Sequence, residues 1–210
     1  SPGNDWWGLE DPWPGTFNFN RDEQGLPFLI YSETGKVADD PQQMLLMLLA
    51  TVPEPGAELL VAKARFDSRN PAISDTAEVL HSFKDGRVRY WAKFDEVGQG
   101  RYAQVFARRP SLQDKRGGNR GLNFTVTEGQ MAIGDADSVW ASAPLNVQPK
   151  VWLGLELECR GDQLTFRAYD NRFLAVQQEV TISSGEYAEG SLALAATNAQ
   201  VEFARVELFD

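Results

Sequence analysis

Alternation of apolar and polar residues is the feature that most limits what this chain can fold into. In the segment VWLGLELECR, residues 151–160, one face of an extended chain carries Val151, Leu153, Leu155, Leu157 and Cys159. The intervening residues are mostly polar or small, which is the pattern of a half-buried strand. Residues 164–169, LTFRAY, repeat the pattern. The sequence therefore predicts two neighbouring strands here.

The tripeptide Arg160-Gly161-Asp162 joins these two segments and has two interpretations. As a motif, it is typical of a cell-adhesion ligand. As a connection, it places Gly161 between polar neighbours, where glycine supplies the positive φ that a tight hairpin needs. Its position between two alternating segments favours the hairpin turn.

Short β-prone segments recur along the chain. They are separated by Gly, Asp, Asn or Ser, and they comprise residues 86–95, 100–109, 121–127, 129–135, 173–182, 191–197 and 200–209. Residues 39–52, DDPQQMLLMLLATV, are ambiguous. Asp40 and Pro41 suit the start of a helix, whereas the short apolar run ending at PEPG suits a buried strand. We favour the strand.

Many short strands with closely spaced turn signals predict an all-β sandwich or barrel. No low-complexity linker or internal repeat divides the chain. We therefore expect one β-sandwich domain over residues 15–210, preceded by a Trp- and Pro-rich arm over residues 1–14. Hydrophobic residues make up 42% of the chain, which is enough for a core without a metal or a disulfide.

Charge and composition exclude several classes of protein. The net charge of −10 argues against nucleic acid as a partner, because nucleic-acid binders carry basic surfaces. The longest apolar run, residues 44–52, is about half as long as a membrane span. Cys159 is the single cysteine, so no intrachain disulfide can form. The start SPGNDWW resembles a trimmed N-terminus, and we expect an extracytoplasmic protein, periplasmic or secreted, whose signal peptide has been removed.

The order of several motifs resembles a known family. Trp152–Tyr169 is similar to a segment in which a tryptophan precedes two alternating strands joined by a charged-Gly-Asp hairpin. The other matching segments are residues 15–30, 83–95, 102–109 and 189–209. Together they resemble the concanavalin A-like (laminin G-like) jelly rolls, most closely the bacterial 3-keto-disaccharide hydrolase-like branch, a domain of unknown function. The resemblance covers most of residues 15–209.

This resemblance implies a two-sheet antiparallel jelly-roll sandwich with one convex and one concave sheet. Sugars commonly bind such folds on the concave face or at its edge loops. The glycanases of the wider superfamily carry an E-x-D-x-x-E motif that places two catalytic acids on one strand face. Here Glu156 and Glu158 share a face, but no third acid follows at the required spacing. In the last strand, Ala204 or Arg205 stands where the family usually has Asp. A calcium-binding or structural role of that Asp therefore cannot be carried over to this chain.

Isolated reactive side chains have ordinary interpretations. His81 is the only histidine and has no nucleophile or metal ligand at a suitable spacing, so we expect a surface or strand-edge residue rather than part of a triad or metal site. Cys159 lies on the apolar face and is expected to be a buried, inert thiol rather than a reactive one. No metal site and no cofactor are expected; calcium is left open, without a motif that supports it.

Tryptophans are concentrated at the N-terminus. Trp6, Trp7 and Trp13 stand in DWWGLEDPWPG, and we favour an arm that buries these rings against the sandwich, with sugar stacking as the alternative. Trp91 and the later tryptophans, Trp140 and Trp152, are expected in the core or at its edge.

Cations are concentrated in residues 101–120, which hold six of the twenty Lys and Arg residues. One interpretation is a solvated loop, because SLQDKRGGNRG at residues 111–121 is polar and rich in glycine. The other is an anion site, because arginine forks and glycine amides both bind acidic groups. The candidate ligand-binding residues are Arg108, Arg109, Lys115, Arg116, Arg120 and Trp13.

The sequence favours an exported carbohydrate-binding or interaction module, with an acidic glycan as ligand. The alternatives are a glycoside hydrolase or lyase acting on a modified (3-keto) sugar, and a structural subunit of an extracytoplasmic assembly. The missing acidic triplet argues against an enzyme. The expected partner is a polysaccharide or oligosaccharide, a protein partner stays open, and neither nucleic acid nor a membrane span is expected.

Overall fold

The computed structural model describes residues 17–21, 27–31, 36–37, 56–69, 74–110, 121–169 and 175–210. In these parts every regular element is a β-strand, and each strand pairs with its neighbours in antiparallel orientation. No helix long and apolar enough to span a membrane occurs in the described parts of the chain. The ambiguous segment 39–52 lies outside them.

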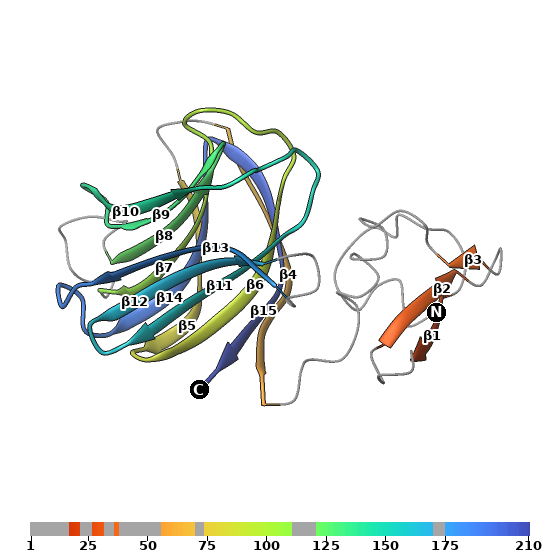
Figure 1. The fold of residues 1–210 in the computed structure, drawn as a ribbon, viewed down its shortest axis with the longest axis horizontal. Helices are drawn as coiled ribbons and strands as arrows, with labels where there is room; N and C mark the ends of the chain where they lie inside the picture. Colours follow the sequence, from red (N-terminus) through yellow and green to blue (C-terminus); the bar gives the residue numbers. More distant parts are fainter. Residues whose placement is uncertain are drawn as a thin grey trace.

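Two six-stranded sheets form the sandwich (Figure 1). Sheet 1 has the order β10-β9-β8-β7-β14-β5, from Val139–Pro144, Gln130–Gly134, Leu122–Thr127, Tyr102–Arg109, Gly190–Thr197 and Ser74–Phe83. Sheet 2 has the order β13-β12-β11-β6-β15-β4, from Val176–Ser183, Gln163–Tyr169, Leu153–Arg160, Gly86–Phe94, Ala199–Phe209 and Glu58–Ser68. The predicted all-β, two-sheet antiparallel sandwich is confirmed.

Three short strands precede the sandwich. β1 (Phe17–Arg21), β2 (Pro27–Tyr31) and β3 (Lys36–Val37) pair only with one another, and they share no ladder with either six-stranded sheet. The proposed boundary between an arm at residues 1–14 and a domain at residues 15–210 stays a prediction.

The core lies between the two sheets and follows the alternation of the sequence. Phe124 of sheet 1 meets Phe166 of sheet 2 edge to face, with ring centroids 5.5 Å apart. Leu155, Leu157 and Cys159 are fully buried on the inner face of β11, as predicted. Burial raises the pKa of the Cys159 thiol to about 12, so this cysteine is the inert thiol that the sequence indicates.

The Arg160-Gly161-Asp162 segment is a hairpin turn. Arg160 pairs with Gln163 across the turn, and Gly161 has a φ of 56°. A positive φ at the first of two central residues is typical of type II′ hairpins, which favour glycine there. The predicted turn is confirmed.

Polar residues on the outer face of sheet 2 are more buried than alternation suggests. Glu156 is 1% exposed, although its place on β11 predicts a solvated carboxylate. The Nε atom of Arg89 donates to it at 2.6 Å, and Nη1 of Arg167 donates at 2.9 Å. Three strands therefore contribute to a charge network that covers this carboxylate.

Tryptophans also lie on this outer face. Trp91 and Trp152 are buried, at 5% and 4% exposure, but neither belongs to the main core cluster. The ammonium groups of Lys63 and Lys93 lie over the Trp152 ring, at 5.6 and 4.8 Å from its centroid. Trp140 is half-buried and packs against the core edge.

Candidate functional site

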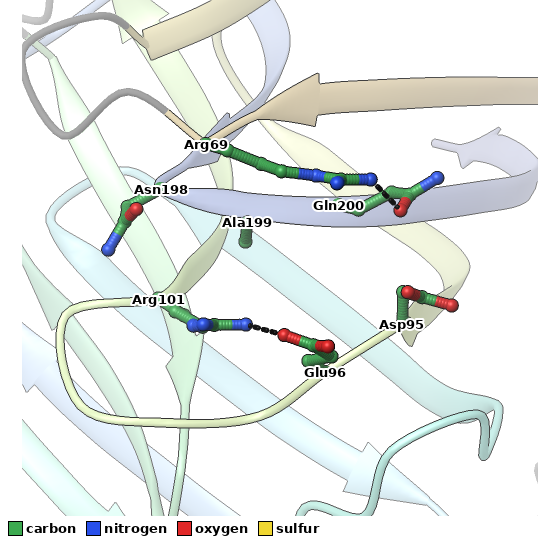
Figure 2. A pocket seen from close by; sticks show the side chains of 7 residues that line it. All are labelled: Arg69, Asp95, Glu96, Arg101, Asn198, Ala199 and Gln200. Atoms are coloured by element: carbon green, nitrogen blue, oxygen red, sulfur yellow. Dashed lines mark hydrogen bonds and ion pairs between the residues drawn. The ribbon is translucent and has the colours of Figure 1, made fainter.

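A small polar cavity lies at one end of the sandwich. Its volume is about 140 Å³, and it is lined by Arg69, Asp95, Glu96, Arg101, Asn198, Ala199 and Gln200. These residues come from the end of β4, the β6–β7 connection, the β14–β15 turn and the start of β15 (Figure 2). The cavity is therefore built from segments that are far apart in the sequence.

Backbone geometry brings these segments together. Asn198 connects β14 to β15 with a φ of 48°, a conformation that asparagine tolerates better than most side chains. The Asp95 backbone N–H donates to the Gln200 carbonyl oxygen at 3.0 Å, which ties the β6–β7 connection to β15. Ala199 is 1% exposed.

Two polar pairs face each other across Ala199 (Figure 2). On one side, Arg69 donates from Nη2 to Gln200 Oε1 at 2.7 Å. On the other side, Arg101 donates from Nη1 to Glu96 Oε2 at 2.5 Å. This hydrogen bond and the charge of Arg101 lower the pKa of Glu96. Arg69 also forms an ion pair with Asp67 at 2.9 Å, so both guanidinium groups already have an acidic partner.

Asp95 and Asn198 differ from these pairs. They lie at opposite ends of the cavity in Figure 2. Neither the Asp95 carboxylate nor the Asn198 side-chain amide has a hydrogen bond or ion pair with another residue in the described parts of the chain. A carboxylate accepts hydrogen bonds, and an amide both donates and accepts. Asp95 is exposed and Asn198 is half-buried, so both groups are open to solvent and suit contact with a ligand rich in hydroxyls.

The predicted cationic cluster is divided between the two ends of the sandwich. Arg101 precedes β7 and lines the cavity, whereas Arg108 and Arg109 lie at the other end of the same strand. Arg108 is 2% exposed. Its guanidinium donates to backbone oxygens of Lys84, Tyr187 and Gly161, and also to Asp85 Oδ1, at 2.7, 3.0, 2.8 and 3.1 Å respectively.

The role of Arg108 follows from these partners. They belong to the β5–β6, β11–β12 and β13–β14 connections, so one guanidinium joins three connections at this end. Arg109 is also buried, at 6% exposure. Both arginines are therefore interior side chains. Lys115, Arg116, Arg120 and Trp13 lie outside the described residues, and their ligand contacts stay a prediction.

Histidine, cysteine and acidic side chains do not gather at one point in the described parts of the chain. No group of three His, Cys, Asp or Glu side chains that could hold a metal ion occurs there. The His81 side chain is 95% exposed and its Nδ1 lies 3.2 Å from Glu78 Oε1. The prediction of a surface histidine is confirmed.

Comparison with known proteins identifies the fold. No family model and no curated protein sequence matches this chain. Carbohydrate-binding module CBM66 from Bacillus subtilis superposes with a TM-score of 0.55 at 15% identity, over 72% of this chain and 93% of that one. The exoplasmic/lumenal domain of VIP36 in its Ca²⁺/Man-bound form gives 0.56 at 11% identity, over 73% and 80%.

The protein has a concanavalin A-like jelly-roll fold. The metal-free form of the VIP36 domain gives a similar TM-score of 0.55 at 10% identity, over 74% of this chain and 82% of that one. At these identities the likeness concerns the fold alone. Membership of the 3-keto-disaccharide hydrolase-like branch stays a prediction.

Sequence reasoning missed most of the cavity. Arg69, Asp95 and Asn198 each stand just beyond a strand end, where polar residues are typical of ordinary turns. The sequence does contain one signal for these turns. The alternating runs are followed by polar residues at Asp95 and Asn198. Only the strand order shows that these turns meet at one end.

Proposed function

We propose that the protein is a non-catalytic carbohydrate-binding module that holds a sugar in the cavity beside Asp95, Asn198 and Gln200. The observation that carries the proposal is the unpartnered carboxylate and amide in a small polar cavity. Sugar hydroxyls both donate and accept, so a sugar can satisfy both groups. The solved structures support this choice as analogies, since one is a carbohydrate-binding module and the other a mannose-bound domain.

The arginine partners of the acids favour binding over catalysis. Glycoside hydrolysis needs a protonated acid whose pKa is raised. Glu96 has a lowered pKa and pairs with Arg101. On sheet 2, Glu156 accepts from Arg89 and Arg167 on separate oxygens, which leaves it engaged as a structural carboxylate. We therefore place hydrolysis or lysis of a modified sugar second to binding.

The proposed glycan ligand indicates the compartment in which the protein works. Polysaccharides large enough to need a dedicated binding module lie mainly outside the cytoplasm, and we propose that this module works there, in the periplasm or after secretion. Fractionation of cells that express the tagged, full-length protein tests this assignment. Recovery with the cytosolic fraction alone would contradict it.

A glycan array with neutral and acidic polysaccharides, run with and without calcium, tests the proposed function. We expect binding to at least one glycan. Asp95→Ala and Asn198→Ala should each weaken it by about ten-fold, which corresponds to one lost hydrogen bond to a charged or polar group. Asp137→Ala is the matched control, because Asp137 is an exposed acid at the opposite end. Equal affinities of the Asp95 and Asp137 variants would reject the cavity as the site.

An acidic glycan is a second candidate ligand, favoured by the three cations of residues 111–120, which the sequence predicts to form a loop. A Cβ added to Gly121 would lie 2.9 Å from Arg109 Cα, and one on Gly190 would lie 2.2 Å from the Arg109 carbonyl oxygen. This packing and the Arg108 hydrogen bonds fix the end of β7, which precedes the predicted loop in the sequence. Lys115, Arg116 and Arg120 would then supply the positive charge.

Charge substitution in this loop tests the second candidate. The double variant Arg116→Ser, Arg120→Ser should weaken binding to polygalacturonate, and added salt should weaken the wild-type interaction because exposed charges are screened within about 8 Å. The control is Arg65→Ser with Lys150→Ser, since both side chains are exposed and outside the loop. Binding that ignores salt, or equal loss in both double variants, would leave the loop without a role.

A further inference from the structure

We propose, resting on the proposed function, that the cavity accepts one uncharged sugar residue at the end of a glycan chain and does not bind the interior of a chain. Asp95 and Asn198 would contact the hydroxyls of that residue. Three features support this ligand class: the size of the cavity, the way its walls are joined, and the balance of its charges.

The size of the cavity limits the ligand. At about 140 Å³, it is well below the roughly 300–1,000 Å³ of pockets that hold larger ligands. One ring of a glycan suits this volume, whereas several consecutive rings need an extended groove. A polysaccharide interior would therefore have to lie across the cavity without entering it.

The walls of the cavity are tied together. The Asp95 N–H bond to the Gln200 carbonyl oxygen joins the β6–β7 connection to β15. Arg101 and Glu96 then pair within that connection, and the Arg101 N–H donates to the Gly98 carbonyl oxygen at 3.3 Å. On the opposite wall Arg69 bonds to Gln200. These bonds lie among the lining residues of the cavity itself, and we infer that the end of a glycan chain enters it more readily than the interior of a chain.

The charges argue against an acidic sugar. The positive groups of the cavity are already neutralised, because Arg69 pairs with Asp67 and Arg101 pairs with Glu96. Asp95 is the acid of the lining set that has no ionic partner in the described parts of the chain. Asp95 is an exposed residue, and a uronate would meet its unpaired negative charge, from which like charge is repelled. A neutral residue with hydroxyl donors avoids the repulsion.

Chain length provides the first test. Dextran, linear β-mannan and galactan are each prepared as a long polymer and as a fraction about ten times shorter, and binding is measured by calorimetry at equal mass. Because the number of ends then rises about ten-fold, the apparent affinity per gram should rise by a similar factor. Asp95→Ala should abolish the rise, and Asp137→Ala should leave it unchanged.

The outcomes separate the inference from the function on which it rests. If a polymer binds but affinity per gram stays equal or falls on shortening, recognition of chain ends is wrong while carbohydrate binding stands. If only acidic polysaccharides on the array bind, the neutral ligand class is wrong. If no glycan binds at all, the proposed function fails together with the inference.

Competition by monosaccharides provides the second test. Galactose is compared with galacturonate, and mannose with mannuronate, as inhibitors of polymer binding. The wild-type protein should be inhibited by the neutral member of at least one pair and at least ten-fold less by its uronate. Asp95→Asn should narrow this difference, because it keeps the side-chain shape and removes the charge. Equal inhibition by both members of each pair would overturn the assignment of an uncharged ligand.

Discussion

At the scale of single residues, burial decides what the charged side chains can do. Arg108 is the clearest case, because its position in a cationic segment indicates a ligand contact, whereas its four bonds lie within the protein. Glu156 is a second case, since alternation predicts a solvated acid and the arginines of β6 and β12 cover it. Alternation identifies the face of a strand, but it does not show which long side chains fold back over that face.

Lys63 gives a residue-scale prediction. Its side chain is 4% exposed, and burial lowers its pKa to about 8, against the opposing attraction of Glu202. Between pH 8 and about 10.5 the unfolded chain therefore binds more protons at this site than the folded chain does. Stability of the wild-type protein relative to a variant without this amine should rise with pH across that window.

The measurement is urea unfolding of Lys63→Met and the wild-type protein at pH 7 and pH 10. Relative to the wild-type protein, Lys63→Met should have its most favourable free energy of unfolding at pH 7, because the buried ammonium is then charged and its desolvation destabilises the wild-type protein most. This difference should be smaller at pH 10. Lys93 remains to pair with Glu202 at 2.9 Å. Lys150→Met, at an exposed position, is the matched control. An advantage of Lys63→Met that grows with pH would contradict the argument.

At the scale of elements, turns position the functional groups. The hairpins and strand connections place Asn198 at one end of the sandwich and Gly161 at the other, and each occupies a conformation with positive φ. Alternation and turn residues in the sequence predict β6 to β9, β11 to β15 and the Gly161 hairpin correctly, but not β4, β5 or β10. They do not predict which connections meet, because that depends on strand order within the two sheets.

Two glycines separate backbone strain from steric overlap. A Cβ on Gly161 would meet nothing within 4 Å, so Gly161→Ala should cost only the strain of a positive φ, about 1 kcal/mol. A Cβ on Gly190 would lie 2.2 Å from the Arg109 carbonyl oxygen, and Gly190→Ala should cost clearly more, because the backbone must move. Urea unfolding of both variants measures the difference. A larger loss of stability for Gly161→Ala than for Gly190→Ala would show that Gly190 packs less tightly against Arg108 and Arg109 than described.

At the scale of the whole molecule, the fold was predictable and the site was not. Period-two alternation and turn chemistry are local properties of the chain and predict an all-β sandwich or barrel, whereas the jelly roll is what the resemblance in the order of weak motifs implies. The cavity is lined by residues 69, 95, 96, 101 and 198–200, which are separate in sequence and ordinary as turn residues. The cationic segment is notable for its density of charge, yet Arg101 precedes β7 and Arg108 lies near its end, so the two lie at opposite ends of the sandwich.

The central claim is that a sugar binds in the cavity beside Asp95 and Asn198. A crystal structure of the protein with the glycan that binds best on the array tests it most directly. We expect one sugar ring in the cavity, with its hydroxyls within hydrogen-bond distance of the Asp95 carboxylate and the Asn198 amide. A ring bound elsewhere, at residues 111–120 or across an outer sheet face, with the cavity unfilled, would contradict the account.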